Sequence, residues 1–308
     1  MNEITRESAP EQLCPVPVRL TALCEAQWSY DEFVRLMPLG PESEGQAYAY
    51  ATAGRVTGAA LNGTLQLTQY PRVRADDVLL ADMHGLVRTE RGEQVVVRAA
   101  GFGLHVPDAP GQRRITHWMR FWTDAPELAW LNATVAFGVG RFGADEVARF
   151  RYFTAVPGET GGEESGDAPE LELLGTARWE YPEYASVRPF GDREGTGYAT
   201  SSGTVEGGPL AGDWRGWHYP SYLRDGLYQI DAHIEIRTDA GIVLMRHGGL
   251  ATRPADLPEG VLYEIVQHAG FVTEIPALAH LNQTLAIGVG VVHDPGIVTV
   301  SYYALPAD

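Results

Sequence analysis

The sequence predicts an all-β protein of two tandem antiparallel β-barrels related by a pseudo-two-fold axis. Runs that alternate apolar and polar residues, the period of a strand, recur along the 308 residues, and 35 glycines and 20 prolines separate them. The second half of the chain also repeats the first. About eight or nine short strands per repeat fit a sandwich or a barrel, and a barrel is favoured because closure leaves no exposed sheet edge.

The repeat is defined by motifs at a nearly constant offset. Asp82 plus 149 is Asp231, and the same shift carries His84 to His233. Further pairs are Tyr70-Pro71 with Tyr219-Pro220, Leu131-Asn132 with Leu281-Asn282, and Gly138-x-Gly140 with Gly288-x-Gly290. The offset stays between 148 and 151 residues, so the chain contains a tandem duplication.

The elements of the first copy, residues 16–156, follow from local patterns. After a strand over 16–26, Ser29 and Glu32 form a capping-box signature, and apolar residues at helical spacing predict a short helix that ends before Pro38. Strands are then expected over 46–53, 55–61, 64–70, 78–89, 93–102, 113–122, 132–140 and 147–156.

Two segments lack such patterns. Residues 157–170 have no apolar periodicity and are acidic, which predicts a flexible linker before the second barrel, residues 171–308. Residues 1–15 are polar and are expected to be loose at the start.

The composition excludes several classes of partner. A formal charge of −17 disfavours nucleic acid and anionic membranes. No apolar run reaches the roughly 18 residues of a membrane helix, and the first residues lack a signal pattern. Cys14 and Cys24 are too few for a disulfide scaffold, so a soluble, reduced, cytoplasmic protein is expected.

Residues 229–238 carry the strongest chemical signal. Asp231, His233, Glu235 and Arg237 share one strand face, and Ile230, Ala232, Ile234 and Ile236 share the other. A carboxylate beside an imidazole can orient it and raise its basicity. Small barrels usually have apolar interiors, which places the polar face in solvent, whereas its retention in both copies favours a polar lumen. Both orientations remain open.

These patterns define the candidate residues. The predicted catalytic residues are Asp231, His233 and Arg237, with Asp82 and His84 in the first copy. The predicted substrate-binding residues are Asp213, Trp214, Trp217, Tyr219, Glu235, Asn282, Trp130 and Asn132.

No cofactor or metal is expected. Asp231 and His233 could be joined by His218, His247 or His268 as metal ligands, but no zinc spacing is present. The GxGxxG match at 138–143 lacks the βαβ context of a dinucleotide site.

Several motifs resemble the domain of unknown function 3237. They are Gly212-Asp213-Trp214, Asp231-x-His233, Thr238-Asp239-x-Gly241, Phe271-x-Thr273, Leu281-Asn282 and Gly288-x-Gly290. The resemblance implies a lipocalin-like or allene-oxide-cyclase-like barrel in each copy. The first copy departs from the family pattern at Thr64-Leu65, which replaces Asp-Trp, and the second at His280, which replaces a tryptophan. Both copies have a histidine where the family often has arginine.

The leading hypothesis is a cofactor-independent cyclase or isomerase for a small, apolar, conjugated molecule of polyketide or terpenoid type. His233, oriented by Asp231, would be the acid–base group, with Arg237 or Asn282 steadying an oxyanion. One alternative is a non-catalytic small-molecule binding or carrier protein. Another is a structural pseudo-dimer, in which the chain is a monomer or forms a homodimer.

Overall fold

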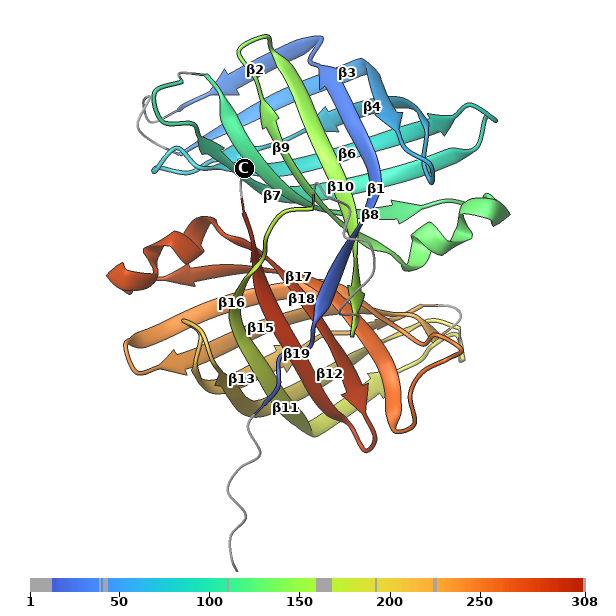
Figure 1. Ribbon diagram of the computed structural model, residues 1–308, viewed down its shortest axis with the longest axis vertical. Helices are drawn as coiled ribbons and strands as arrows, with labels where there is room; N and C mark the ends of the chain where they lie inside the picture. Colours follow the sequence, from blue (N-terminus) through green and yellow to red (C-terminus); the bar gives the residue numbers. More distant parts are fainter. Residues whose placement is uncertain are drawn as a thin grey trace, which may run out of the picture.

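The computed structural model describes residues 13–38, 40, 44–109, 111–158, 168–191, 193–223 and 226–306. They form two β-barrels that lie one above the other along the long axis of the molecule (Figure 1). The two barrels are consecutive in sequence, as the repeat predicts. No helix in the described part of the chain is long and apolar enough to cross a membrane.

The first barrel closes through eight strands. Its elements are β1 (Val18–Ser29), β2 (Glu32–Leu36), β3 (Gly45–Thr57), β4 (Gly63–Gln69), β5 (Arg72–Val73), β6 (Leu79–Thr89), β7 (Gln94–His105), β8 (Arg113–Trp122), the 3-10 helix η1 (Pro126–Ala133), β9 (Val135–Phe142) and β10 (Val147–Pro157). Hydrogen-bonded neighbours run β1-β10-β9-β8-β7-β6-β4-β3, and β3 pairs back with β1.

The second barrel repeats this order. Its elements are β11 (Glu172–Val187), β12 (Gly195–Glu206), β13 (Gly212–His218), β14 (Ser221–Tyr222), β15 (Tyr228–Thr238), β16 (Gly241–Thr252), β17 (Val261–Thr273), the 3-10 helix η3 (Pro276–Gln283), β18 (Leu285–His293) and β19 (Ile297–Leu305). The order β11-β19-β18-β17-β16-β15-β13-β12 closes through β11 and β12. The prediction of two tandem antiparallel barrels is confirmed.

Three local predictions differ from the structure. The helix predicted after Ser29 is wrong, because the segment forms β2, whose backbone pairs with β3. The strands predicted at 46–53 and 55–61 are one strand, β3, with an irregularity between Ala51 and Gly54. The strand predicted from 132 begins at Val135, since η1 occupies the preceding residues. Most of the predicted linker, 159–167, and most of the predicted loose start, 1–12, lie outside the described residues.

The barrels pack together through an apolar interface. It is formed by Leu20, Val135, Phe137, Val139, Phe153 and Ala155 of the first copy and by Leu250, Leu285, Ile287, Val289 and Leu305 of the second. Phe137 and Ile287 lie 150 residues apart at equivalent positions, so the same surface of each barrel is used. An interface that contacts its own equivalent has two-fold character, as the repeat predicts.

Candidate functional site

The predicted catalytic face of β15 lies outside the second barrel. Ala232, Ile234 and Ile236 are at most 3% exposed and belong to the barrel core, whereas His233 is exposed. Of the two orientations that the sequence leaves open, the structure shows the one with the aliphatic face inside the barrel. A closed eight-stranded barrel has room for one face of side chains, and burial of the aliphatic face yields the larger hydrophobic gain.

The predicted carboxylate–imidazole pair is not formed in the second copy. Asp231 Oδ1 lies 3.6 Å from Arg246 Nη2, and the His233 ring stands edge-on to Tyr219 at 6.0 Å between centroids. In the first copy, Asp82 Oδ1 and His84 Nε2 are 3.3 Å apart, with both side chains about half exposed. These residues lack the enclosure that general acid–base catalysis exploits.

The other predicted residues have mixed positions. Arg237 is exposed and donates to Glu235 at 2.6 Å. Asp213, Trp217, Tyr219 and Trp130 are also exposed, and only Trp214 of this set is buried in the barrel core, 2% exposed.

Asn282 and Asn132 hold the 3-10 helices against the barrels. Asn282 Oδ1 accepts from the Thr273 amide at 2.8 Å, and its Nδ2 donates to the Thr273 carbonyl at 3.0 Å. Asn132 makes the same two bonds to Thr123, each at 2.9 Å. Both side-chain amides are committed to backbone groups, and their substrate-binding role stays a prediction.

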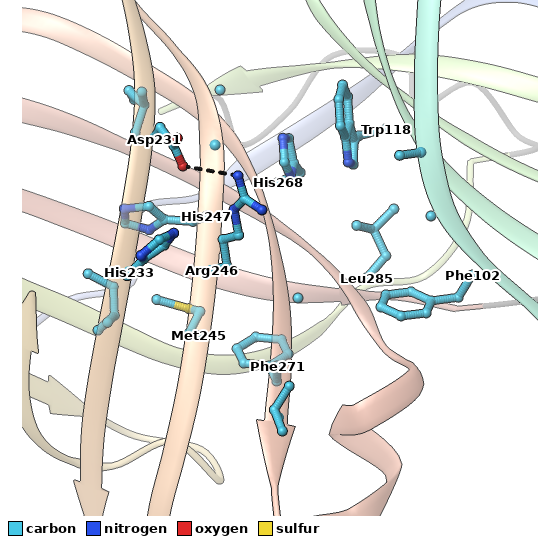
Figure 2. A pocket seen from close by; sticks show the side chains of 18 of the residues that line it. Phe102, Trp118, Asp231, His233, Met245, Arg246, His247, His268, Phe271 and Leu285 are labelled. Atoms are coloured by element: carbon cyan, nitrogen blue, oxygen red, sulfur yellow. Dashed lines mark ion pairs between the residues drawn. The ribbon is translucent and has the colours of Figure 1, made fainter. Parts of the chain in front are cut away.

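Part of the polar face does border a cavity, of about 960 Å³, between the barrels. Asp231, His233 and Glu235 line it from the second barrel, with Trp217 and Asn282. Figure 2 shows Asp231 and Arg246 on one side of this cavity and Trp118, from the first barrel, on the other. We call this cavity the inter-barrel cleft.

A second cavity, of about 210 Å³, lies within the second barrel; we call it the lumen. Its lining is mainly aromatic and aliphatic, with three polar side chains, His218, His247 and Gln267. The aromatic residues that line it are Trp179, Tyr181, Tyr184, Tyr228 and Tyr263. An apolar cavity with a few convergent polar groups is the usual form of a small-molecule site.

His218 is placed in the lumen by the alternation of β13. Trp214, Gly216 and His218 are buried and share the inner face, while Asp213, Arg215 and Trp217 point outward. The Ser201 hydroxyl lies 2.8 Å from His218 Nε2 and accepts from Trp214 Nε1 at 3.0 Å. Burial lowers the pKa of His218 to about 4, so the ring is uncharged at neutral pH.

His247 belongs to a second buried network. Gln267 Nε2 donates to the Tyr302 hydroxyl at 2.7 Å, and this hydroxyl lies 2.9 Å from His247 Nδ1. His247 is 1% exposed, and its Nε2 has no hydrogen-bond partner among the described residues. Burial, and then the neighbouring His218, lower its pKa well below the ordinary value. The His218 and His247 rings are 5.8 Å apart between centroids.

The sequence-based site omitted this lumen. The sequence offers His218 and His247 as possible third metal ligands, and His218 also as part of an aromatic-rich hairpin, but Ser201, Gln267 and Tyr302 are not among the predicted site residues. The alternation Trp214-x-Gly216-x-His218 was the available signal, because it places a histidine on the same face as the family tryptophan. Within the described part of the chain, no three potential ligands among His, Cys, Asp and Glu are grouped to hold a metal.

Comparison with models of protein families gives one match. The model of the "Protein of unknown function (DUF3237)" family matches residues 18–154, which span the strands of the first barrel. The first barrel matches the DUF3237 family. No curated protein matches the chain.

Three solved structures are similar to just under half of the chain. A "beta-barrel like protein" from Acinetobacter baumannii is 19% identical, with a TM-score of 0.42, and covers 47% of this chain and 100% of its own. A protein of unknown function from Clostridium acetobutylicum is 14% identical, with a TM-score of 0.41, and covers 46% and 100%. A structure described as an enzyme from Penicillium herquei is 19% identical, with a TM-score of 0.38, and covers 48% and 100%.

The interior of the first barrel, which matches the DUF3237 family, has different side chains from those around the lumen of the second barrel. Strand register places Gln69 at the position of His218 and Ala99 at that of His247. At five equivalent positions the first barrel has the larger side chain. The pairs, first barrel before second, are Met83 and Ala232, Met119 and Ala269, Leu67 and Gly216, Phe142 and Val292, and Phe150 and Val300. The paired histidines and the space around them therefore belong to the second barrel.

Proposed function

We propose that the lumen of the second barrel is the active site of a cofactor-independent cyclase or isomerase. Its substrate would be a small, planar, largely apolar molecule with a conjugated carbonyl or phenol oxygen. The observation that carries the proposal is the pair of uncharged, buried imidazoles in an otherwise aromatic cavity, one with an unpartnered nitrogen.

The hydrogen-bond network supports a role for His247 as a hydrogen-bond donor. The Tyr302 hydroxyl accepts from Gln267, so its own proton is free to donate to His247 Nδ1. An uncharged ring that accepts at Nδ1 carries its proton on Nε2. His247 would then donate from Nε2 to a substrate oxygen and stabilise the negative charge that develops there in an enolate or phenolate.

His218 suits proton exchange. Its partner is a hydroxyl, which can donate to or accept from Nε2, so the ring can carry its proton on either nitrogen. Negative charge developing on a nearby substrate oxygen would favour the protonated ring during the reaction. His218 would thus take a proton from one substrate atom and return it to another, with no net change in the protein.

The lumen wall supplies the rest of the catalytic effect. Apolar surroundings strengthen the hydrogen bond from His247, because water is excluded and the local dielectric is low. A lumen of about 210 Å³ is small compared with ordinary ligand cavities, so it favours a compact substrate. Confinement would hold such a substrate in one reactive orientation.

Deuterium exchange of 1-indanone, a planar bicyclic ketone, tests the proposal. Enolisation replaces its α-hydrogens in D₂O, which NMR detects directly. The protein should accelerate this exchange, and His247→Phe and His218→Phe should each lower the rate by roughly a hundredfold, the size of a general acid–base contribution. The exposed His84→Phe serves as the matched control.

A carrier is the second candidate, because burial lowers the pKa of both lumen histidines and makes them weak bases, and the described residues lining the lumen include no carboxylate to assist them. Val292→Phe copies Phe142 of the first barrel and should fill the mouth of the lumen. Binding of 1-indanone that is lost in Val292→Phe, without any accelerated exchange in the wild type, would favour the carrier. An exchange rate that neither histidine variant changes would contradict the proposed activity.

A further inference from the structure

The inter-barrel cleft gathers arginines in an acidic protein. The chain has a formal charge of −17, yet Arg74, Arg98 and Arg120 of the first barrel and Arg246 of the second line this cavity. Three of them face carboxylates. Arg74 pairs with Asp76 at 2.5 Å, Arg246 with Asp231 at 3.6 Å, and Arg98 lies 3.9 Å from Asp82.

Arg120 differs from the other three. Its side chain is only 6% exposed, and its Nε has no hydrogen-bond partner among the described residues. Burial lowers its pKa to about 10, so it remains charged at neutral pH. Its guanidinium lies 5.6 Å from the centre of the Trp122 ring. A buried cation without a counter-charge is unfavourable, and an anion in the cleft would remove this cost.

Aromatic side chains line the cleft beside these charges. Trp118 stacks on His268 of the other barrel, with 4.1 Å between ring centroids and an interplanar angle of 5°. Figure 2 shows the two rings face to face at the cleft. Trp122 is 44% exposed and Trp217 is 36% exposed, so both leave ring surface free to contact a ligand.

The duplication pairs Arg120 with a glycine of the second barrel. The equivalent position of the second barrel, 150 residues later, is Gly270, which also lines the cleft. A Cβ at Gly270 would meet only the Phe102 ring, at 3.6 Å. One barrel therefore contributes a cation where the other contributes open space.

We propose that the inter-barrel cleft binds a planar aromatic carboxylate, whose charge pairs with Arg120 and whose ring lies against the tryptophans. Arg98 and Arg246 flank this position from the two barrels, and the carboxylates Asp231 and Glu235 are occupied by Arg246 and Arg237. The cleft shares Ile230 and His247 with the lumen, but Arg120 and the tryptophans line the cleft alone, and the proposal does not depend on the activity proposed for the lumen.

Pyrene-1-carboxylate is a suitable probe, because it is planar, fluorescent and too large for a lumen of about 210 Å³, whereas the cleft has about 960 Å³. Fluorescence anisotropy should show binding to the full chain. Arg120→Gln should weaken it at least about tenfold, the usual contribution of a charge-assisted hydrogen bond. Arg55→Gln, at an exposed position of β3, should bind as the wild type does. The uncharged pyrene-1-carboxamide should bind at least about tenfold more weakly.

Two further variants locate the probe. Gly270→Leu should abolish binding by filling the cleft, with an unchanged circular-dichroism spectrum showing that the barrels persist. Val292→Phe, which fills the lumen, should leave binding unchanged. Equal affinity of the Arg120→Gln variant, equal affinity for the carboxamide, or loss of binding in Val292→Phe would each overturn the proposal.

Discussion

The two asparagines retained in both copies show that retention of a residue need not mark a binding site. Asn132 and Asn282 each form two hydrogen bonds with the backbone of one threonine, and each ties a 3-10 helix to the strand before it. Both repeats have this same connection between a 3-10 helix and the end of a strand. The constraint is therefore structural, and it acts equally on both copies.

Loss of this connection should be measurable. We expect Asn282→Ala to lower the free energy of unfolding by about 1–3 kcal/mol, because the backbone groups of Thr273 lose both partners. Urea unfolding followed by circular dichroism measures the change. Asn62→Ala removes a single, longer bond, 3.3 Å to the exposed Glu90, and should change stability by less than about 0.5 kcal/mol. Equal effects of the two variants would refute the structural role.

The buried histidines should make stability depend on pH. The pKa of His218 is lowered from 6.5 to about 4, mainly by burial. Between these values the unfolded chain binds a proton that the folded chain excludes, so the free energy of unfolding falls as the pH falls through this window. Above pH 6.5 the effect is absent. His117 acts with the same sign, since burial lowers its pKa to about 3.

Urea unfolding at pH 7.5 and pH 5 tests this dependence. His218 should contribute about 2 kcal/mol to the loss of stability between the two values. The loss should therefore be smaller by that amount in His218→Asn, whereas the exposed His84→Asn should behave as the wild type. An identical pH dependence in all three proteins would show that His218 is not shielded from solvent in the folded state.

At the scale of strands, a buried glycine on the inner face of β13 and a glycine that lines the cleft should respond differently to substitution. A Cβ on Gly216, in β13, would lie 2.4 Å from Ser201 Oγ and 2.5 Å from Ile234 Cδ1. We expect Gly216→Ala to lower the melting temperature and to destabilise the fold by about 1–3 kcal/mol through overpacking. Gly270→Ala, in β17, meets Phe102 at an ordinary 3.6 Å and should be tolerated. The opposite order in differential scanning calorimetry would contradict the packing described for the lumen.

Strand periodicity accounts for what the sequence could and could not predict. Alternation and the repeat predict the two barrels and most strands correctly. Alternation divides β15 into two faces but does not say which one is inside, and retention of Asp231 and His233 in both copies favoured the wrong face. The energy of burying the aliphatic face decides the orientation. The segment Glu32–Leu36 was misread because five residues are too few to separate a helical period from a strand that pairs with β3.

The position of the lumen residues depends on contacts between distant strands. Ser201, His218, His247, Gln267 and Tyr302 come from five different strands, and sequence spacing does not reveal which of them meet. The inter-barrel cleft is harder still to predict, because it exists only after both barrels have packed together.

For the whole molecule, duplication has allowed the two barrels to diverge. Met83, Met119 and Phe150 occupy the first lumen at positions where the second has Ala232, Ala269 and Val300. The first barrel contributes packing surface and half of the cleft, while the second keeps the histidines. Isothermal titration calorimetry should therefore show about one equivalent of 1-indanone bound per chain. Two equivalents would mean that the interior of the first barrel also has room for the ligand.

The crystal structure of the 1-indanone complex tests the central claim most directly. The ligand should lie inside the second barrel, with its carbonyl oxygen within hydrogen-bond distance of His247 Nε2 and its ring against the aromatic wall. Ligand density confined to the inter-barrel cleft, or an oxygen directed away from both lumen histidines, would contradict the account.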